Sequence, residues 1–461
     1  MTARSRLVLV LLWAALPLAA TAVVLTPYGR TWFFYDEWSW IARVLSPHGG
    51  HLRAAFQPFN GHLQFFGYFV FLAQVEWFGL TNHALVYGVF VLSLVALHVG
   101  IAVTLRGLGL APAPAVVGGL ALAYFGTGAQ CMVFEVLLYT NFAVFFALVA
   151  GLVVIRLQPG PGPAAAVVLA LFAATGFDSA IAMAASAFVV SLLAARWRQA
   201  PAWIAAALLP PVAAWIAWVR WAGTSSVLDR AVPMAERVEV GVRLVLRSVG
   251  GFFGGTEAAG IAVIAVSTAI IGTAVARRRL RGRPLQGLAA GTLAAAAFAL
   301  AVAATRGGMI GRNFVDFNRY LANIGVFAFV ALAPAILASV PAWLAARSRI
   351  VTGVATAMCA LMFVLNLGPL SSYRRAFEAW NGETRTGVEQ AVAVLERGCP
   401  AGTHLSLDTR PFGPVAPQIS VGLLATAWRR GLFQFGPAAV VDPALAAAMC
   451  VASGRPAPAG R

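Results

Sequence analysis

Apolar segments of about 20 residues recur along almost the whole chain, and this pattern limits the fold more than any other feature. The chain has 461 residues, of which 60% are hydrophobic and 11% are charged. Soluble globular proteins carry about 25% charged residues. A helix of about 20 apolar residues crosses the roughly 30 Å hydrocarbon core of a bilayer. The sequence therefore predicts an all-α polytopic membrane protein.

Hydropathy predicts about eleven membrane-spanning helices. The first follows Arg4 and Arg6 and is expected to stay uncleaved, because its apolar run over 7–26 is longer than the core of a typical signal peptide. The later spans are expected near 84–105, 113–127, 136–155, 164–177, 179–195, 201–221, 259–276, 285–304, 320–345 and 350–368. One helix over 164–195 would be about 48 Å long, too long for a single crossing, so a turn is expected near Gly176.

The basic residues, which are all arginine, predict the orientation of these spans. With the N-terminus inside, the Arg-rich loops, including the cluster at 277–283, face the cytoplasm, as short cytoplasmic loops usually do. The apolar segment 62–78 would reverse every later loop if it crossed the membrane. We therefore expect it to be an interfacial or re-entrant helix on the outer side. The prediction is a multi-pass protein of a bacterial plasma membrane with its C-terminus outside.

All 16 acidic residues then fall in outer loops or near the outer ends of spans. The predicted division is a membrane module over 1–368, with a first outer loop at 27–82 and a middle outer loop at 222–258, followed by a tail or small domain over 369–461. No nucleotide-binding glycine motif is present, which argues against ATP-driven transport. The net charge of +17 would suggest a nucleic-acid partner in a soluble chain, but here the distribution of the charges matters more than their sum, and no nucleic-acid partner is expected.

The adjacent carboxylates of Asp36 and Glu37 lie in an aromatic stretch, 32–40, just after the first span. A carboxylate near lipid loses hydration, so its placement there calls for a reason. One reason is general-base chemistry on a hydroxyl group. The alternative is that the pair only solvates the start of a helix, where acidic residues are favoured.

The order of motifs in the first outer loop resembles the GT-C superfamily of membrane glycosyltransferases. After the acidic pair come Gln57-Pro58-Phe59-Asn60-Gly61-His62-Leu63 and then an apolar helix that closes with Phe78-Gly79 before the second span. The chain is most similar to the branch of protein O-mannosyltransferases and aminoarabinose transferases. The resemblance covers residues 1–110; beyond that only span count and topology agree.

The resemblance implies transfer of a sugar from a polyprenyl-phosphate donor to a hydroxyl acceptor, with inversion and with Asp36 as the general base. Glu37 would orient that base, bind the acceptor or hold a cation. The resemblance also implies a donor-phosphate site where Arg319 and Tyr320 enter a span, with Arg312 as second choice and Arg43 as a further candidate. A planar guanidinium suits phosphate oxygens, although Arg and Tyr also serve as interfacial anchors.

Asn60, His62, Glu135 and Tyr320 are candidate substrate-binding residues. Asn60 and His62 belong to a turn that leads back to the membrane, but Asn-Gly is also a plain turn signal. Glu135 and Asp178 are isolated acids beside apolar segments, and for Asp178 a helix-capping role is favoured. No metal-binding motif is present. No cofactor is required by this prediction, and a divalent cation at the acidic pair is not favoured.

The tail carries its own pattern. The stretch 386–397 has helical periodicity, and 402–407 alternates like a short strand. Cys399 and Cys450 share an oxidising compartment, and a disulfide between them is expected.

Three other classes stay open. A transporter or flippase of a lipid-linked glycan would handle the same lipids, but no paired broken helices mark inverted repeats. A polymerase or ligase that uses a diphosphate-linked donor would place its key residues in a large late loop. The third is a scaffold subunit of a cell-envelope complex with a degenerate site.

Overall fold

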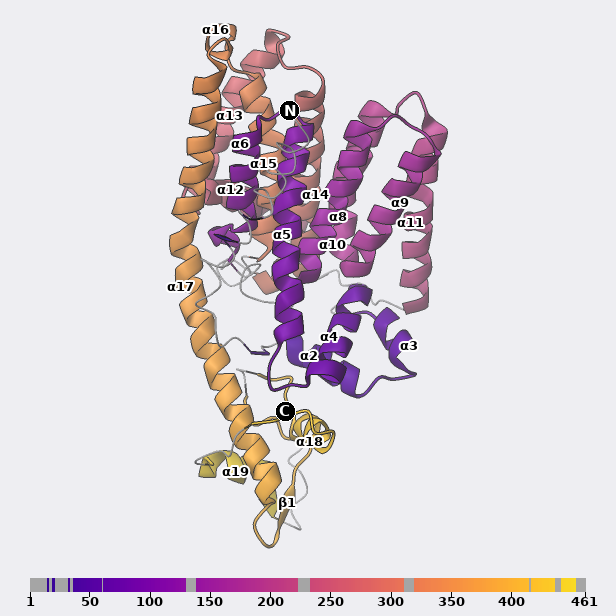
Figure 1. The fold of residues 1–461 in the computed structure, drawn as a ribbon, viewed down its shortest axis with the longest axis vertical. Coiled ribbons are helices and arrows are strands. Elements are labelled where there is room, and N and C mark those ends of the chain that lie inside the picture. Colours follow the sequence, from indigo (N-terminus) through magenta and orange to yellow (C-terminus); the bar gives the residue numbers. More distant parts are fainter. Residues whose placement is uncertain are drawn as a thin grey trace. The chain divides into compact units, whose positions relative to one another are not determined.

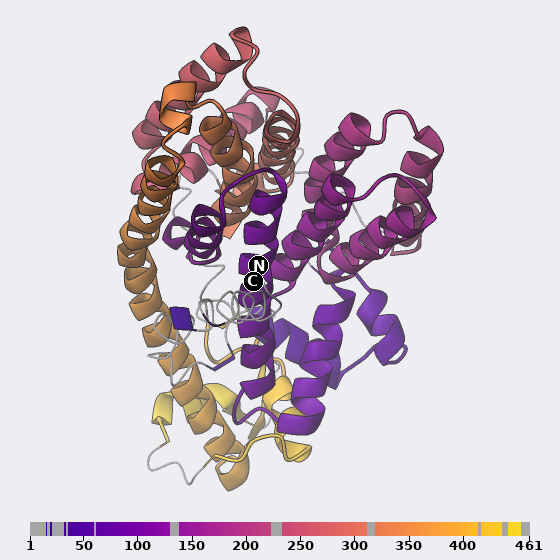
Figure 2. The same cartoon turned by 45° about the horizontal axis from the view of Figure 1, so that its top comes forward.

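The computed structural model describes residues 15, 19–20, 32–33, 36–59, 61–129, 138–222, 233–310, 319–413, 416–435 and 441–452 (Figures 1 and 2). Helices dominate, and eight of those in the described ranges are long and apolar enough to cross a membrane. This agrees with an all-α multi-pass membrane protein. The chain divides into two compact units. Unit 1 comprises 1–24, 58–65 and 91–373, and unit 2 comprises 25–57, 66–90 and 374–461.

Unit 1 is a bundle of helices joined mostly by short turns (Figure 1). Its elements are α5 (Ala84–Gly107), which begins in unit 2, α6 (Pro112–Ala123), η2 (Gly126–Gly128), α8 (Leu138–Arg156), α9 (Pro161–Phe177), α10 (Ser179–Arg196), α11 (Pro201–Ala222), α12 (Met234–Gly250), η4 (Gly251–Phe253), α13 (Glu257–Ala276), α14 (Arg283–Ile310), α15 (Arg319–Ala338), α16 (Ala342–Ala345) and the first half of α17 (Ser348–Arg397). Within the bundle, α8, α9 and α10 pack together, and α12 packs against α13, α14 and α15.

Eight predicted spans correspond to helices α5, α8, α10, α11, α13, α14, α15 and α17. The turn expected near Gly176 is also confirmed, because α9 ends at Phe177 and α10 begins at Ser179. The 17-residue helix α9 is shorter than those eight. The first predicted span, 7–26, lies almost wholly outside the described residues.

The predicted span 113–127 is too long. Helix α6 has 12 residues and ends at Ala123, which gives about 18 Å, less than a bilayer core. The chain turns there because the glycines of η2 allow a close approach to α17. The side-chain oxygen of Asn366 accepts a hydrogen bond from the Thr127 amide at 3.0 Å, and its amide group donates to the Gly251 carbonyl at 2.9 Å.

Two span ends also differ from the prediction. The span predicted over 320–345 stops with α15 at Ala338, and the chain turns before Pro341. The span predicted over 350–368 continues as α17 to Arg397, through Pro369 and past the predicted domain boundary. Hydropathy marks where apolar character ends. The helix continues through a polar sequence rich in Ala, Glu and Arg, which favour helices, although Pro369, Gly382 and Gly387 lie within it.

Much of the described part of the predicted middle outer loop, 222–258, is helical. It contains the 17-residue amphipathic helix α12, which buries Val240 and Leu244 while charged side chains lie on its other side. A charged helix of this kind is missed when only long apolar runs are sought.

Unit 2 contains α2 (Asp36–Leu45), α3 (His51–Phe56), α4 (Phe65–Phe78) apart from its first residue, the last part of α17, β1 (Thr403–Leu405), α18 (Val421–Arg429), α19 (Pro443–Met449) and β2 (Cys450–Ala452). The predicted helix over 386–397 and the predicted strand are both confirmed. Strands β1 and β2 are antiparallel, with Leu405 opposite Cys450. The predicted disulfide between Cys399 and Cys450 is confirmed as well.

A first prediction concerns the contact between η2 and α17. A Cβ atom added to Gly126 would overlap the backbone carbonyl of Asn366, so Gly126→Ala is expected to destabilise the protein by about 1–3 kcal/mol. Gly272→Ala in α13 is the matched control, since no atom lies within 4 Å of the added carbon. In thermal unfolding in detergent, Gly126→Ala should have a lower midpoint than Gly272→Ala. Equal midpoints for the two variants would contradict the close contact between η2 and α17.

Candidate functional site

The acidic pair begins helix α2. Asp36 and Glu37 occupy its first turn and Arg43 its last turn, so both ends complement the helix dipole. Consecutive side chains on a helix diverge by about 100°, and the two acids have different surroundings. Asp36 is half-buried, whereas Glu37 is only 1% exposed. Glu37 is therefore shielded from solvent, while the first-turn position of both acids also fits the stabilisation of a helix start.

An aromatic and basic cluster lies along α2 and α4. The Trp40 ring is nearly parallel to that of Phe71, with centroids 5.9 Å apart, and meets Tyr68 edge-on at 6.3 Å. The guanidinium of Arg43 lies 5.7 Å from the centre of the Trp40 ring. The Tyr68 hydroxyl is 2.8 Å from Nδ1 of His51. Helices α2, α3 and α4 each contribute at least one side chain to this cluster.

Burial shifts the pKa values of two side chains in this cluster. Desolvation lowers the pKa of Arg43 below its ordinary value, and the nearby Tyr68 counteracts this in part. Desolvation raises the pKa of Tyr68, and the positive charge of Arg43 opposes that rise. Arg43 remains a cation at neutral pH because an arginine loses its proton only at very high pH. The cluster thus presents a partly desolvated cation on the helix that carries the acids.

The start of α2 is held by Trp32, which is fully buried. Its indole N–H donates to the Leu80 carbonyl at 2.8 Å, and its own carbonyl accepts from the Asn381 side chain. The Trp32 ring also meets Trp38 and Phe435 edge-on, at 5.3 and 6.1 Å. The first loop and the C-terminal region therefore meet at one residue, four positions before Asp36.

In unit 1, the predicted turn around Gly61 is present. Phe59 and His62 exchange both backbone hydrogen bonds, at 2.8 and 2.9 Å, and Gly61 has a φ of 82°. The next two residues bind the α9–α10 turn. The Leu63 amide donates to the Ser179 hydroxyl at 2.9 Å, and the Gln64 side chain donates to Asp178 at 3.2 Å.

Asp178 caps the start of helix α10, which is the role that the sequence favoured for it. Its carboxylate accepts from the Ala180 and Ile181 amides at 3.0 and 3.1 Å at the start of α10. With Gln64 as a third donor, this carboxylate is held by structural contacts. It positions the chain next to His62, whose proposed contact with substrate stays a prediction.

The other predicted site residues are placed only in part. Tyr320 lies in the first turn of α15, and Arg319 begins that helix, although its side chain is not described. Asn60, Glu135 and Arg312 lie outside the described residues. Asp36, Glu37 and Arg43 belong to unit 2, whereas His62, Arg319 and Tyr320 belong to unit 1.

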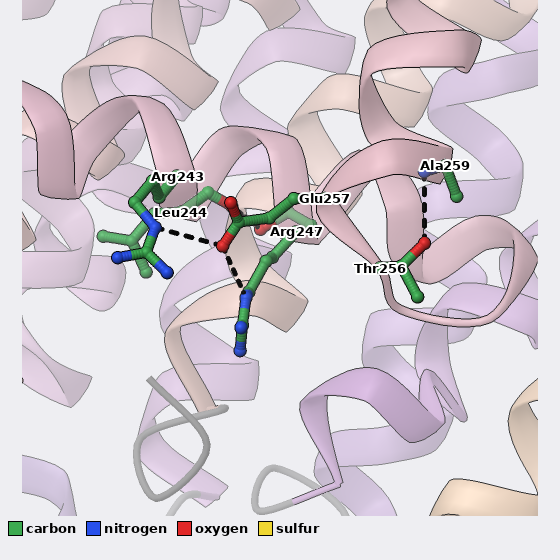
Figure 3. A network of polar contacts seen from close by, with 7 residues as sticks. Arg243, Leu244, Arg247, Thr256, Glu257 and Ala259 are labelled. Atoms are coloured by element: carbon green, nitrogen blue, oxygen red, sulfur yellow. Dashed lines mark hydrogen bonds and ion pairs between the residues drawn. The ribbon is translucent and has the colours of Figure 1, made fainter. Parts of the chain in front are cut away.

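Several polar contacts in the structure could not be read from the sequence. His51 and Tyr68 gave no signal because their contact depends on how α3 packs against α4. Arg243 and Arg247 lie one turn apart on α12, and their Nε atoms both donate to the Glu257 carboxylate, at 3.1 and 2.9 Å (Figure 3). Periodicity of charge over 236–247 could have indicated this helix. The arrangement puts two cations on one carboxylate and leaves a net charge of +1.

Unit 1 also contains an apolar cavity of about 410 Å³. Elements α6, η4, α13, α15, α16 and α17 line it, including Phe252, Phe329, Val354 and Met358. The lining on α17 runs from Ile350 to Met362, a rise of about 18 Å along that helix. A cavity with this length and composition suits a hydrocarbon chain.

Among the described residues, no group of three or more histidine, cysteine, aspartate or glutamate side chains is placed to hold a metal ion. Comparison of the chain with models of protein families, with curated proteins and with solved structures finds no significant match.

Proposed function

We propose that this protein is a membrane glycosyltransferase that moves a sugar from a polyprenyl-phosphate donor to a hydroxyl acceptor at the outer face of the plasma membrane. The burial of Glu37 beside Asp36 is the observation that carries this proposal. A carboxylate that only solvated a helix start would stay in water. A carboxylate removed from water next to a half-buried one is typical of acid–base sites.

In the proposed reaction, the acceptor oxygen attacks the anomeric carbon of the sugar. The bond between that carbon and the phosphate oxygen breaks, and the polyprenyl phosphate departs with the bonding electrons. Asp36 takes the proton of the acceptor hydroxyl, while Glu37 orients Asp36 or the acceptor. Cationic side chains stabilise the charge that develops on the phosphate, with Arg319 proposed first, then Arg312 and Arg43.

The apolar cavity supports a lipid-linked donor as the substrate class. A lipid carrier needs a dry channel for its chain and a polar site for its head group. The cavity alone would serve a transporter or flippase of the same lipid equally well. What favours transfer over transport is the acidic helix α2, since moving an intact lipid requires no general base.

A transfer assay tests the proposal. Purified protein in lipid nanodiscs would receive labelled polyprenyl-phosphate sugars and a mixture of hydroxyl acceptors. Labelled acceptor is the expected product. In sealed vesicles, movement of the intact lipid-linked sugar across the bilayer without transfer would instead establish the transporter class and end the enzyme proposal.

The phosphate role of Arg319 makes a separate prediction. Arg319→Ala is expected to weaken donor binding about 10- to 100-fold, because a hydrogen bond to a charged group contributes about 1.5–3 kcal/mol. Arg385→Ala, which removes an ion pair on the exposed surface of α17, is the control and should bind the donor normally. Unchanged donor affinity in Arg319→Ala would remove this residue from the site.

A further inference from the structure

Helix α4 exposes a stripe of apolar side chains along one side. Phe66, Val70, Ala73 and Trp77 recur at helical spacing, so they fall on one face. Trp77 is 77% exposed and Phe66 39% exposed. The opposite side is buried and contains Phe71, which stacks on Trp40 of α2. An amphipathic helix in a soluble domain would show charged residues on its outer face, and this one shows aromatic residues.

The corner that follows α4 has its polar groups bound internally. The Gln74 amide group donates to the Gly79 and Asn82 carbonyls at 3.1 and 2.9 Å. Its oxygen accepts from the Leu85 and Val86 amides at 3.0 and 3.3 Å, at the start of α5. One side chain thus binds four backbone groups of the corner. Backbone groups need such internal partners where water is scarce.

The position of this corner along the chain places it at a membrane boundary. Helix α5 begins at Ala84 and is one of the helices long and apolar enough to cross a bilayer. Only residues 79–83 separate it from α4, and they can extend by no more than about 18 Å. The 14 residues of α4 give about 21 Å, too short to cross a core of about 30 Å.

We propose that α4 lies in the interfacial layer of the membrane that α5 crosses, with the stripe from Phe66 to Trp77 in contact with lipid. Tryptophan prefers this layer because its ring is apolar and its N–H is polar. The ion pair between Glu76 and Arg430, at 2.7 Å, lies next to Trp77 and suits the polar head-group region. The partner of this surface is a leaflet of phospholipids.

If the proposed function holds, contact between α4 and the membrane would also position the acidic pair. Helix α2 packs on the opposite side of α4 through Trp40, so α4 would fix the depth of Asp36 and Glu37 relative to the bilayer surface. A sugar attached to a lipid phosphate is presented at that same level. The lipid contact itself can be tested without any activity measurement, so its failure is distinguishable from failure of the transferase proposal.

Spin labels test the lipid contact on the full-length protein in phospholipid nanodiscs. Single cysteines would replace Phe66, Ala73 or Trp77 in a background with serine at Cys131 and Cys359 and with the disulfide retained. Leu407→Cys and Glu383→Cys, at exposed positions of unit 2, are the controls. Collision of each label with oxygen, which concentrates in lipid, is compared with collision with a water-soluble nickel complex.

Labels on the stripe are expected to collide preferentially with oxygen, and labels at 383 and 407 with the nickel complex. Nickel accessibility at 66 and 77 equal to that at 407 would overturn the proposal. Immobile labels that neither reagent reaches would also overturn it, because a second protein surface would then cover the stripe. If Trp77→Cys does not elute as the native protein does, Phe66→Cys and Ala73→Cys decide the matter.

Discussion

Asp36→Asn is expected to lower the turnover of sugar transfer by a factor of about 10²–10⁴, the usual contribution of a general base. The asparagine amide matches the carboxylate in size but cannot take the proton of the acceptor hydroxyl. The fold should survive, because Asp36 is half-buried in the first turn of α2 and its charge contributes about 0.3–1 kcal/mol to the helix. Single-turnover transfer of a labelled donor measures the effect.

Two further variants make this result specific. Glu378→Gln removes another carboxylate of unit 2, which is paired with Arg374 on the surface of α17, and should transfer sugar at the native rate. Glu37→Gln should also lose activity if the buried acid orients Asp36. Equal product from native protein and Asp36→Asn would eliminate Asp36 as the base, even if the transferase proposal itself survived.

Loss of the disulfide between Cys399 and Cys450 should have the largest effect on stability. The bond closes a loop with a sequence separation of 51 residues, and bonds of this kind typically stabilise a protein by about 2–4 kcal/mol by restricting the unfolded chain. We expect Cys399→Ser and Cys450→Ser to lower the unfolding midpoint of unit 2. The readout is hydrogen exchange of β1, β2 and the end of α17.

Reductant provides the matched measurement. Treating the native protein with a thiol should reproduce the effect of either serine variant, whereas treating Cys399→Ser should change nothing further. Cys359→Ser is the control, since that thiol is free and buried in unit 1. Native protection of β1 and β2 after the disulfide is removed would show that packing alone holds this region.

Local patterns predicted much of the fold. Long apolar runs located eight helices, and alternation located β1, because each depends on neighbouring residues in the sequence. Prediction failed where packing decides. The end of α6 depends on how closely Gly126 and Asn366 approach each other, and the continuation of α17 past residue 368 follows from helix propensity that a hydropathy profile does not measure.

In the candidate site, too, the features set by local sequence could be predicted, and those set by tertiary packing could not. The acidic pair at the start of a helix could be predicted, because acids near an aromatic stretch form a local signal. The burial of Glu37 could not be predicted, since burial depends on how α2 packs against other elements, and one of them, α18, comes from a distant part of the sequence. The same holds for His51 and Tyr68, whose contact needs two helices, and for Arg243 and Arg247, which meet Glu257 only after the chain turns at η4.

The contacts around Trp32 join residues that the ribosome makes at very different times. The Leu80 carbonyl accepts a hydrogen bond from the Trp32 indole, and the Leu80 amide donates one to the Leu432 carbonyl at 2.8 Å. Leu80 and Leu432 are 352 positions apart in the sequence (432 − 80). A ribosome adds about 5–20 residues per second, so the partner of Leu80 emerges roughly 20–70 s later. Until then the start of α2 lacks the part of its support that Leu432 provides through Leu80 and Trp32.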